Sequence, residues 1–237
     1  MIIWLIEMEQ IILSQMCHFR MTKVVCTTIL PPPIVYEAVD LGLPSGTKWA
    51  SQNVGARKPS DAGLYFQWGD VSGYTADQVG TGKGKKKFSS DYSDYKWYLS
   101  GDSYHNVAFT KYTTQGATLE LEDDAAHVNM GGSWHIPTPT QIDELIYNTT
   151  TAYTTSDGVQ GLAFTSKKDN SKSIFIPAAG YVDNGPIDSI GIYISIWLSM
   201  LDTNDVYNGK AFQFAFGYII TPSIERYYGM SIRGVIG

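Results

Sequence analysis

Three histidines and two neighbouring carboxylates are the residues after position 35 that could hold a redox-active metal. His127 and His135 are eight positions apart around a predicted helix end, and His105 lies upstream. A facial triad needs two histidines, one carboxylate and open coordination positions, and Asp123 or Asp124 could supply the carboxylate. No metal-ligand spacing links the three histidines, however, so surface or helix-capping roles are favoured over an iron site.

A second possible chemistry is calcium binding by the acidic run at 122–124. Glu122, Asp123 and Asp124 offer hard oxygen ligands. Calcium needs six or more such ligands, which usually converge from loops. Three adjacent carboxylates at the start of a helix are more often solvated partners of the helix dipole. We therefore predict no resident metal and no cofactor.

Nucleophilic and nucleotide chemistry have no sequence signature in this chain. Its two cysteines, Cys17 and Cys26, lie before the main domain, so the domain has neither a disulfide framework nor a thiol nucleophile. The sequence contains no Gly-x-Ser-x-Gly elbow, P-loop or dinucleotide fingerprint. These absences predict a protein that is not an enzyme.

Composition indicates a strand-rich globular domain. The chain has 237 residues, of which 43% are hydrophobic and 13% aromatic, and its 23 Gly and 16 Tyr favour short strands and ordered turns over long helices. The net charge is -6 and no basic face is evident, which argues against nucleic-acid binding. The basic run at 82–88, "GKGKKKF", is predicted to be a solvated loop.

The first 34 residues are predicted to be a segment separate from the domain at 35–237. The apolar stretch "MIIWLI" is too short to span a bilayer, and no signal-peptide pattern surrounds it. Pro31, Pro32 and Pro33 form a stiff linker. The segment is either an attachment to a larger assembly, through residues 1–35, or the product of a mis-called start, since Met8, Met16 and Met21 are alternative starts.

Local patterns predict an α+β fold with two helices followed by many strands. Residues 119–132 are predicted to be helical, with Leu121, Ala125 and Val128 on one face and Gly131 at the end. In 134–149, Thr138 is the expected N-cap of a second helix that has Pro139 at its first position. Gln141 completes a capping box, and Ile142, Leu145 and Ile146 form the buried stripe. Residues 159–166 and 172–181 are predicted to form a hairpin, and later segments alternate with the period of a strand. The long stretch at 71–112 has little periodicity, and irregular runs of this length often carry function.

One of these later segments, "SIGIYISIWLSML" at 189–201, has a large apolar residue at every second position. Successive side chains of a strand point to opposite faces. If Tyr193 and Trp197 point inward, the row of Ile192, Ile194, Ile196, Leu198 and Met200 faces outward, where it would bind a ligand or another subunit. The alternative is a central strand that is buried on both faces. The sequence leaves the choice open.

Several segments together resemble the Fibrobacter-type major paralogous domain, a family abundant in gut bacteria and their phages. The resemblance covers roughly residues 36–237 and is weak between 71 and 112. It rests on "VDLGLPSGTKWASQNVGA", "YFQWGD", "LEDDAAHVNMGGSWHIPTPTQIDEL", "SIFIPAAGY" and "RYYGMSIRGV". The order of helix, "WHIPT", helix and terminal "GMSIR" is similar to the formylglycine-generating-enzyme branch of the C-type lectin fold.

The resemblance implies a C-type lectin-like fold, with two helices packed on mixed antiparallel sheets, and favours binding over catalysis. His135 stands where the enzyme branch has Arg, Met230 stands where it has Phe, and its copper-binding cysteines are missing. The Glu-Pro-Asn and Gln-Pro-Asp motifs of calcium-dependent lectins are also missing. Variable proteins of diversity-generating retroelements share this fold, and they vary C-terminal positions while keeping a framework.

On this resemblance, framework positions include Gly191, Trp197, Ser199, Leu201, Ala211, Phe212, Phe214 and Phe216. The positions where small polar residues are usual, together with neighbouring polar and aromatic side chains, are expected to bind ligand. These are Ile192, Tyr193, Ile194, Ser195, Ile196, Leu198, Met200, Tyr207, Asn208, Gln213, Ala215, Tyr218, Ile220, Ser223 and Ile224.

The function expected from this resemblance is a receptor-binding protein or adhesin, on a virion or on a bacterial cell surface. Its partner would be a protein or glycan receptor on a cell surface. The alternative is a non-enzymatic structural component of a phage tail or surface appendage that forms a homo-oligomer through the apolar row.

Overall fold

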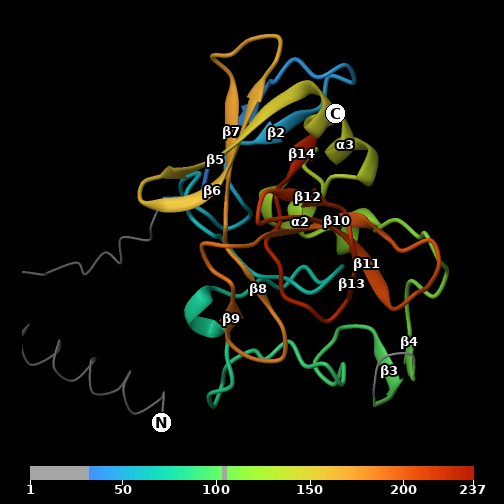
Figure 1. Cartoon of the computed structure of the whole chain (residues 1–237). Helices are drawn as coiled ribbons and strands as arrows, with labels where there is room; N and C mark the ends of the chain where they lie inside the picture. Colours follow the sequence, from blue (N-terminus) through green and yellow to red (C-terminus); the bar gives the residue numbers. More distant parts are fainter. Residues whose placement is uncertain (1–31, 103–105) are drawn as a thin grey trace, which may run out of the picture. The chain divides into compact units, whose positions relative to one another are not determined.

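A computed structural model describes residues 32–102 and 106–237 of the chain. Ile34–Gly237 forms one compact unit of short antiparallel strands and two α-helices, so the α+β class is confirmed (Figure 1). Nearly all of the predicted attachment segment at 1–34 lies outside the described residues. In the part of the chain that is described, no helix has the length and hydrophobicity needed to cross a bilayer.

The elements of this unit are short, and long irregular connections at 51–75 and 79–97 separate β2 from β3. The helices are α2 (Ala125–Met130), α3 (Pro139–Asn148) and the 3-10 turns η1 (Ala76–Gln78) and η2 (Leu121–Asp123). The strands are β1 (Ala38–Val39), β2 (Lys48–Ala50), β3 (Tyr98–Gly101), β4 (Val107–Phe109), β5 (Thr149–Ser156), β6 (Val159–Ser166), β7 (Ser173–Pro177), β8 (Tyr181–Val182), β9 (Ile187–Asp188), β10 (Ile194–Leu201), β11 (Asn208–Ala215), β12 (Tyr218–Ile220), β13 (Ser223–Glu225) and β14 (Val235–Ile236).

These strands form five antiparallel sheets. Strand β2 lies between β1 and β14, so the two ends of the unit are joined. Strands β5, β6 and β7 form a meander, and β10 pairs with β11, which also pairs with β12 and β13. The pairs β3–β4 and β8–β9 are separate ribbons. The predicted hairpin of β6 and β7 is confirmed.

Helix α3 begins and packs as its sequence predicts. The Thr138 hydroxyl accepts a hydrogen bond from the Gln141 N–H, and the Gln141 side chain accepts one from the Thr138 N–H, so the capping box is formed. Ile142 and Leu145 are buried in the core. Local capping and a continuous apolar stripe agree here, which is why the sequence prediction was correct.

The prediction for residues 119–132 was only partly correct. A 3-10 turn precedes α2, and Asp124 caps α2 by accepting a hydrogen bond from the His127 N–H. Gly131 ends the helix with a φ of 75°. The predicted stripe is wrong, because Leu121 and Val128 are exposed. The cap divides the segment, so the two apolar residues do not share a continuous helical face.

Strand β10 is buried on both of its faces. Ile194, Ile196 and Leu198 lie in one core with α3 and the β5–β7 sheet. Trp197, on the opposite face, is fully buried in a second core that is rich in aromatic residues. The outward apolar row is therefore wrong for the middle of the strand, and the fully buried alternative is confirmed.

This burial also excludes Ile194 and Ile196 from any contact with a ligand or another subunit. Ile194 and Ile196 are 0% and 1% exposed, so they cannot contact a ligand or another subunit without unfolding the sheet. Ile192 is 45% exposed because it lies before the strand, in a turn. An aspartate at Ile194 or Ile196 would place a charge in the core, so such variants test folding and not ligand binding.

The irregular segment at 71–112 supplies much of the aromatic core where it is described. Tyr92, Tyr95, Trp97, Phe109 and Tyr112 are buried, and their rings meet edge to face at centroid distances of 5.0–5.8 Å. The run at 82–88 is mostly exposed, as predicted. Large rings thus replace regular backbone hydrogen bonding as the source of order in this segment.

Two buried arginines tie distant segments together through backbone carbonyls. The Arg233 guanidinium donates hydrogen bonds to Ala50 O, Phe175 O and Asn53 Oδ1 at 2.8–2.9 Å. Arg226 donates to Val206 O and Tyr112 O, and its guanidinium carbon lies 3.9 Å from the Phe109 ring centroid. Each planar guanidinium satisfies several carbonyls that would otherwise be buried without a donor.

The burial of β10 predicts that two isoleucines of the same row contribute very different amounts to the free energy of unfolding. Replacing Ile196 with Ala should lower the free energy of unfolding by about 2–5 kcal/mol, because it removes buried methyl groups and leaves a cavity. Replacing Ile192 with Ala should change it by no more than about 0.5 kcal/mol, since this side chain is largely solvated. Urea denaturation of both variants measures the difference, and equal small effects would contradict the buried strand.

Candidate ligand-binding surface

The predicted binding residues do not form one surface. Some are buried, some are half-buried and three are exposed. The buried members are Ile194, Ser195, Ile196, Leu198, Asn208 and Gln213. The half-buried members are Tyr193, Met200, Tyr207, Ala215, Ser223 and Ile224. Ile192, Tyr218 and Ile220 are exposed. The last three lie at one end of the β10–β11–β12 sheet. The side chains within β10 that were expected to be exposed are buried or half-buried.

The polar members are used mainly inside the unit. The Gln213 side-chain amide donates to the Ser195 hydroxyl at 3.2 Å across buried faces of β10 and β11. The Asn208 side chain donates to the Asp205 carboxylate at 2.9 Å. These bonds fix strands and turns, so the three residues have a structural role.

Ser223 belongs to a charged network between β10, β11 and β13. The Lys210 ammonium lies 2.6 Å from the Asp202 carboxylate, which also accepts hydrogen bonds from the Ser223 hydroxyl and the Asn204 N–H. Burial acts to raise the pKa of Asp202. The Lys210, Ser223 and Asn204 donors outweigh that effect, and the pKa lies well below its ordinary value.

Five large side chains form an exposed surface at the end of the β11–β12 hairpin, here called the tip surface. It consists of Tyr153, Ile192 and Phe216, which border one cavity, and of Tyr218 and Ile220. The last two pair with Ala215 and Gln213, so they point to the face of the sheet opposite to Phe214. Phe216 and Tyr218 are each 74% exposed. Single exposed apolar residues are common on proteins, but a group that borders one cavity, as Tyr153, Ile192 and Phe216 do, is typical of an interaction site.

A shallow apolar cavity of about 290 Å³ opens within the tip surface. It is lined by Tyr153, Gly191, Ile192, Phe214, Phe216 and Gly217. The Tyr153 and Phe214 rings lie 5.2 Å apart at an angle of 31°. No residue of this lining carries a charge, so the cavity suits an apolar group.

The turn at 189–192 is held firmly beside the cavity. Gly191 N–H donates to Ala178 O at 2.8 Å, and the Tyr153 hydroxyl donates to Gly191 O at 2.7 Å. Ser189 and Gly191 both have positive φ, at 57° and 78°, which produces the tight turn. The cavity wall is thus pre-formed by hydrogen bonds from two neighbouring segments.

Phe216 occupies an unusual backbone conformation. With Gly217 it forms the two-residue turn between β11 and β12, and its φ is 52°. The first position of such a turn usually has Asn, Asp or Gly, because a side chain with a bulky ring is disfavoured at positive φ. Phe216 therefore accepts a conformational cost of about 1–3 kcal/mol while its ring stays in solvent.

Tyrosine rings extend the aromatic surface away from Phe216. The Tyr193 ring meets Phe216 edge to face at 5.8 Å and Tyr181 at 5.7 Å. Tyr181 in turn lies 6.0 Å from Tyr228, whose hydroxyl donates to Asp183 at 3.0 Å. Burial, with a further contribution from the Asp183 charge, raises the pKa of Tyr228, so its phenol stays neutral.

The histidines do not form a metal centre in the described part of the chain. His127 Nδ1 lies 3.3 Å from Trp134 O, and His135 Nδ1 lies 3.1 Å from Ile136 O. The one cluster of potential metal ligands found among the described residues contains no histidine. His105 lies outside the described residues.

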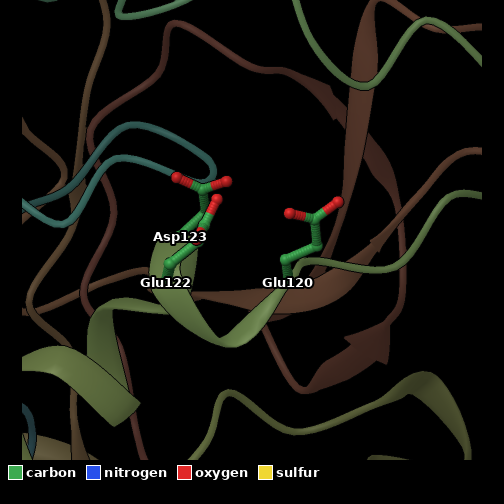
Figure 2. A group of neighbouring side chains, drawn as sticks. All are labelled: Glu120, Glu122 and Asp123. Carbon is green, nitrogen blue, oxygen red and sulfur yellow. The ribbon is translucent and has the colours of Figure 1, made fainter.

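That cluster consists of Glu120, Glu122 and Asp123, and it differs from the acidic run considered in the sequence. Figure 2 shows these three carboxylates gathered at the 3-10 turn η2. The Lys111 ammonium lies 2.5–3.1 Å from all three of them. Asp124 is instead buried as the helix cap, where it also accepts a hydrogen bond from the Ile136 N–H.

A second lysine completes the neutralisation of Asp123. Lys96 approaches it at 2.7 Å, and the Tyr112 hydroxyl donates to it at 2.9 Å. Burial acts to raise the pKa of Asp123, but these donors and Lys111 outweigh it and lower the pKa. The acidic group therefore belongs to an ion-pair network in which Lys111 joins the exposed Glu120 and Glu122 to the buried Asp123.

Sequence reasoning missed two members of the tip surface. Phe216 was assigned to the framework on the family resemblance, together with Phe212 and Phe214, but the chain turns there. The following Gly217 was the available signal for a two-residue turn. Tyr153 was missed together with β5, although Asp157 and Gly158 between two runs of β-forming residues are a strong hairpin signal.

Comparisons with models of protein families, with curated proteins and with solved structures each found no match.

The Asp202 network predicts a pH-dependent effect on stability. Replacing Asp202 with Asn should cost about 2 kcal/mol near neutral pH, because it removes charged hydrogen bonds from Lys210 and Ser223. The folded-state pKa of Asp202 is depressed, so its stabilisation is fully present above the unfolded pKa and is lost as pH falls below it. Thermal denaturation should therefore show the wild type and D202N converging below about pH 4. A stability difference that stays constant down to pH 2 would contradict this role.

Proposed function

We propose that this protein is a non-enzymatic binding module whose tip surface recognises a protein ligand. The observation that carries the proposal is Phe216, which adopts a costly backbone conformation and yet leaves its ring 74% exposed. A strained residue at a surface turn is explained by function when packing does not explain it. Here the ring contributes little to the core and is presented to solvent.

The tip surface has the composition of an interaction hot spot. Aromatic anchors dominate the binding energy of protein interfaces, above all when they are rigid and surround a pocket. Tyr153 and Gly191 are hydrogen-bonded to each other, and Tyr193 supports the Phe216 ring. Little side-chain conformational freedom is then lost on binding, which favours affinity.

The cavity favours an apolar group of a protein over a free small molecule. Pockets that enclose drug-sized ligands usually have volumes of about 300–1,000 Å³ and surround most of the ligand. At about 290 Å³, this cavity lies at the lower end of that range, and it is open, so it would leave much of a free ligand in solvent. It fits one apolar side chain of a partner whose other contacts lie on Ile192 and Phe216 and continue past the turn to Tyr218.

The proposal includes the C-type lectin-like fold and a role in surface recognition. The order of α2, Trp134–Thr138, α3 and a terminal segment anchored by buried Arg233 agrees with the layout that the sequence resembles. In such a protein, diversified positions have to face solvent if variants are to fold. Ile192, Tyr218 and Ile220 meet that requirement, whereas Ile194, Ile196 and Leu198 do not. A receptor-binding role on a virion or bacterial surface follows from the same resemblance.

Selection from a displayed peptide library, with the purified full chain as bait, tests the tip surface. Selected peptides should contain an apolar anchor, and they should bind the F216S/Y218S variant at least about tenfold more weakly, since each lost hot-spot ring costs 1 kcal/mol or more. Both side chains are exposed, so the variant should keep the thermal stability of the wild type. Isothermal titration calorimetry with the selected peptides measures the change.

The matched control is L99S/Y147S, which removes two exposed apolar side chains outside the tip surface. This variant should bind the selected peptides like the wild type. Equal losses in both variants would indicate non-specific hydrophobic attachment. Peptides that bind F216S/Y218S as tightly as the wild type would refute the tip surface as the binding site.

The resemblance to diversified proteins has a genetic test. The DNA downstream of this gene should contain a near-copy of the codons for roughly residues 185–235, differing mainly at adenines, beside a reverse-transcriptase gene. The differing codons should correspond to exposed positions such as Ile192, Tyr218 and Ile220. A genomic neighbourhood without such a copy would leave a binding module of fixed sequence.

A further inference from the structure

Strand β5 is an exposed edge strand without any charged residue. Its sequence is "TTTAYTTS", and all six residues from Thr150 to Thr155 are exposed. It pairs with β6 along its full length with no register shift. Figure 1 shows this hairpin in yellow. Its turn is tied down at Asp157, which accepts a hydrogen bond from Ser60 at 2.8 Å and pairs with Lys58 at 3.1 Å.

The turn determines which backbone groups of β5 face outward. Asp157 and Gly158 have φ values of 50° and 81°, as in a two-residue hairpin turn, so Ser156 and Val159 form a hydrogen-bonded pair. Hydrogen-bonded pairs then recur at every second residue. The bond from Lys167 N–H to Asn148 O, at 3.1 Å, confirms this alternation at the other end of the strand.

It follows that Thr151, Tyr153 and Thr155 direct their N–H and C=O groups away from β6. Within residues 32–102 and 106–237, no backbone hydrogen bond reaches these groups. Natural proteins usually protect such an edge with a lysine, a proline, a bulge or a covering segment. Strand β5 has no lysine, proline or bulge, and its exposed side chains show that no described segment covers it.

We infer that this edge is the contact through which two copies of the chain pair, with β5 antiparallel to β5 of the second copy. A two-fold axis perpendicular to the sheet passes at Tyr153 in this arrangement. Tyr153 then lies opposite Tyr153 of the second copy, and Thr151 of each copy lies opposite Thr155 of the other. Each of these pairs joins two residues whose backbone groups face outward, so the hydrogen bonds of both edges are satisfied.

A second copy fits this edge because the strand is self-complementary. Antiparallel pairing of identical strands produces an isologous contact, in which each residue pair away from the two-fold axis occurs twice. The chosen register makes one Tyr–Tyr pair and two Thr–Thr pairs, both of which stabilise antiparallel sheets. With no charge between Thr149 and Ser156, the pairing brings no like charges together.

The contact also has a consequence for the tip surface. A perpendicular two-fold axis keeps equivalent faces of the joined sheet on the same side. Tyr153 lines the apolar cavity in each copy, so the dimer presents two cavities toward one side. Two linked sites raise the avidity for a repetitive target without any new contact. Dimerisation itself does not require a ligand and is tested without one.

Sedimentation velocity on the full chain, from micromolar to millimolar concentration, tests the contact. The wild type should shift from the 26.2 kDa chain toward twice that mass as concentration rises. The T151K/T155K variant should remain monomeric, because the register places its lysines opposite each other twice. The T151K/T155E variant should dimerise again, since the same register now places opposite charges together.

The matched control is T150K/T154K, which adds the same charge to the same strand. In the proposed register these positions lie opposite Ser156 and Ala152, so this variant should still dimerise. Circular dichroism and thermal melting establish that each variant is folded. A wild type that stays at the mass of one chain at every concentration overturns the proposal. A T151K/T155K variant that dimerises with the affinity of the wild type would also overturn the proposal.

Discussion

The burial of β10 on both faces is the constraint on which the rest of the unit depends. One face lies against α3 and the β5–β7 sheet, and the other lies against the aromatic core. The Trp197 indole donates to Phe66 O at 2.8 Å, and the Trp68 indole donates to Leu198 O at 2.9 Å. These reciprocal bonds join β10 to the segment around Trp68. The segment around Trp68 has little regular structure, and it stays ordered because both indole N–H groups find acceptors in the interior.

This arrangement limits where a ligand can be bound. The middle of β10 cannot change its residues freely, because both faces are filled by core side chains. Its ends are different, since the turn at 189–192 and the β11–β12 turn extend beyond the packed sheets. Recognition at such turns is compatible with stability because a rigid scaffold positions them while their side chains remain exposed. The same logic explains why Phe216 and Ile192, rather than Ile194 and Ile196, belong to the tip surface.

The acidic residues at η2 suggested metal binding, but they are paired with lysines, and other charged side chains likewise bond within the unit. Lys111 and Lys96 pair with the acidic group at η2, and Lys210 pairs with Asp202. Arg226 and Arg233 satisfy backbone carbonyls where short strands leave gaps between ladders. In a fold with few long strands, such side chains replace part of the backbone hydrogen bonding. The proposed binding role accordingly rests on the exposed aromatic surface.

The sequence by itself determined the features that depend on neighbouring residues. The α+β class, the capping box of α3, the hairpin of β6 and β7 and the end of α2 at Gly131 follow from local propensity, spacing and capping. The tertiary structure alone decided which face of each strand is buried. Alternation in 189–201 has the same appearance for a strand with one buried face and for a strand between two cores. Likewise, the similar spacing of Phe212, Phe214 and Phe216 did not reveal that the last ring lies beyond the sheet. Burial depends on which distant segments pack against a residue, and a one-dimensional pattern does not contain that information.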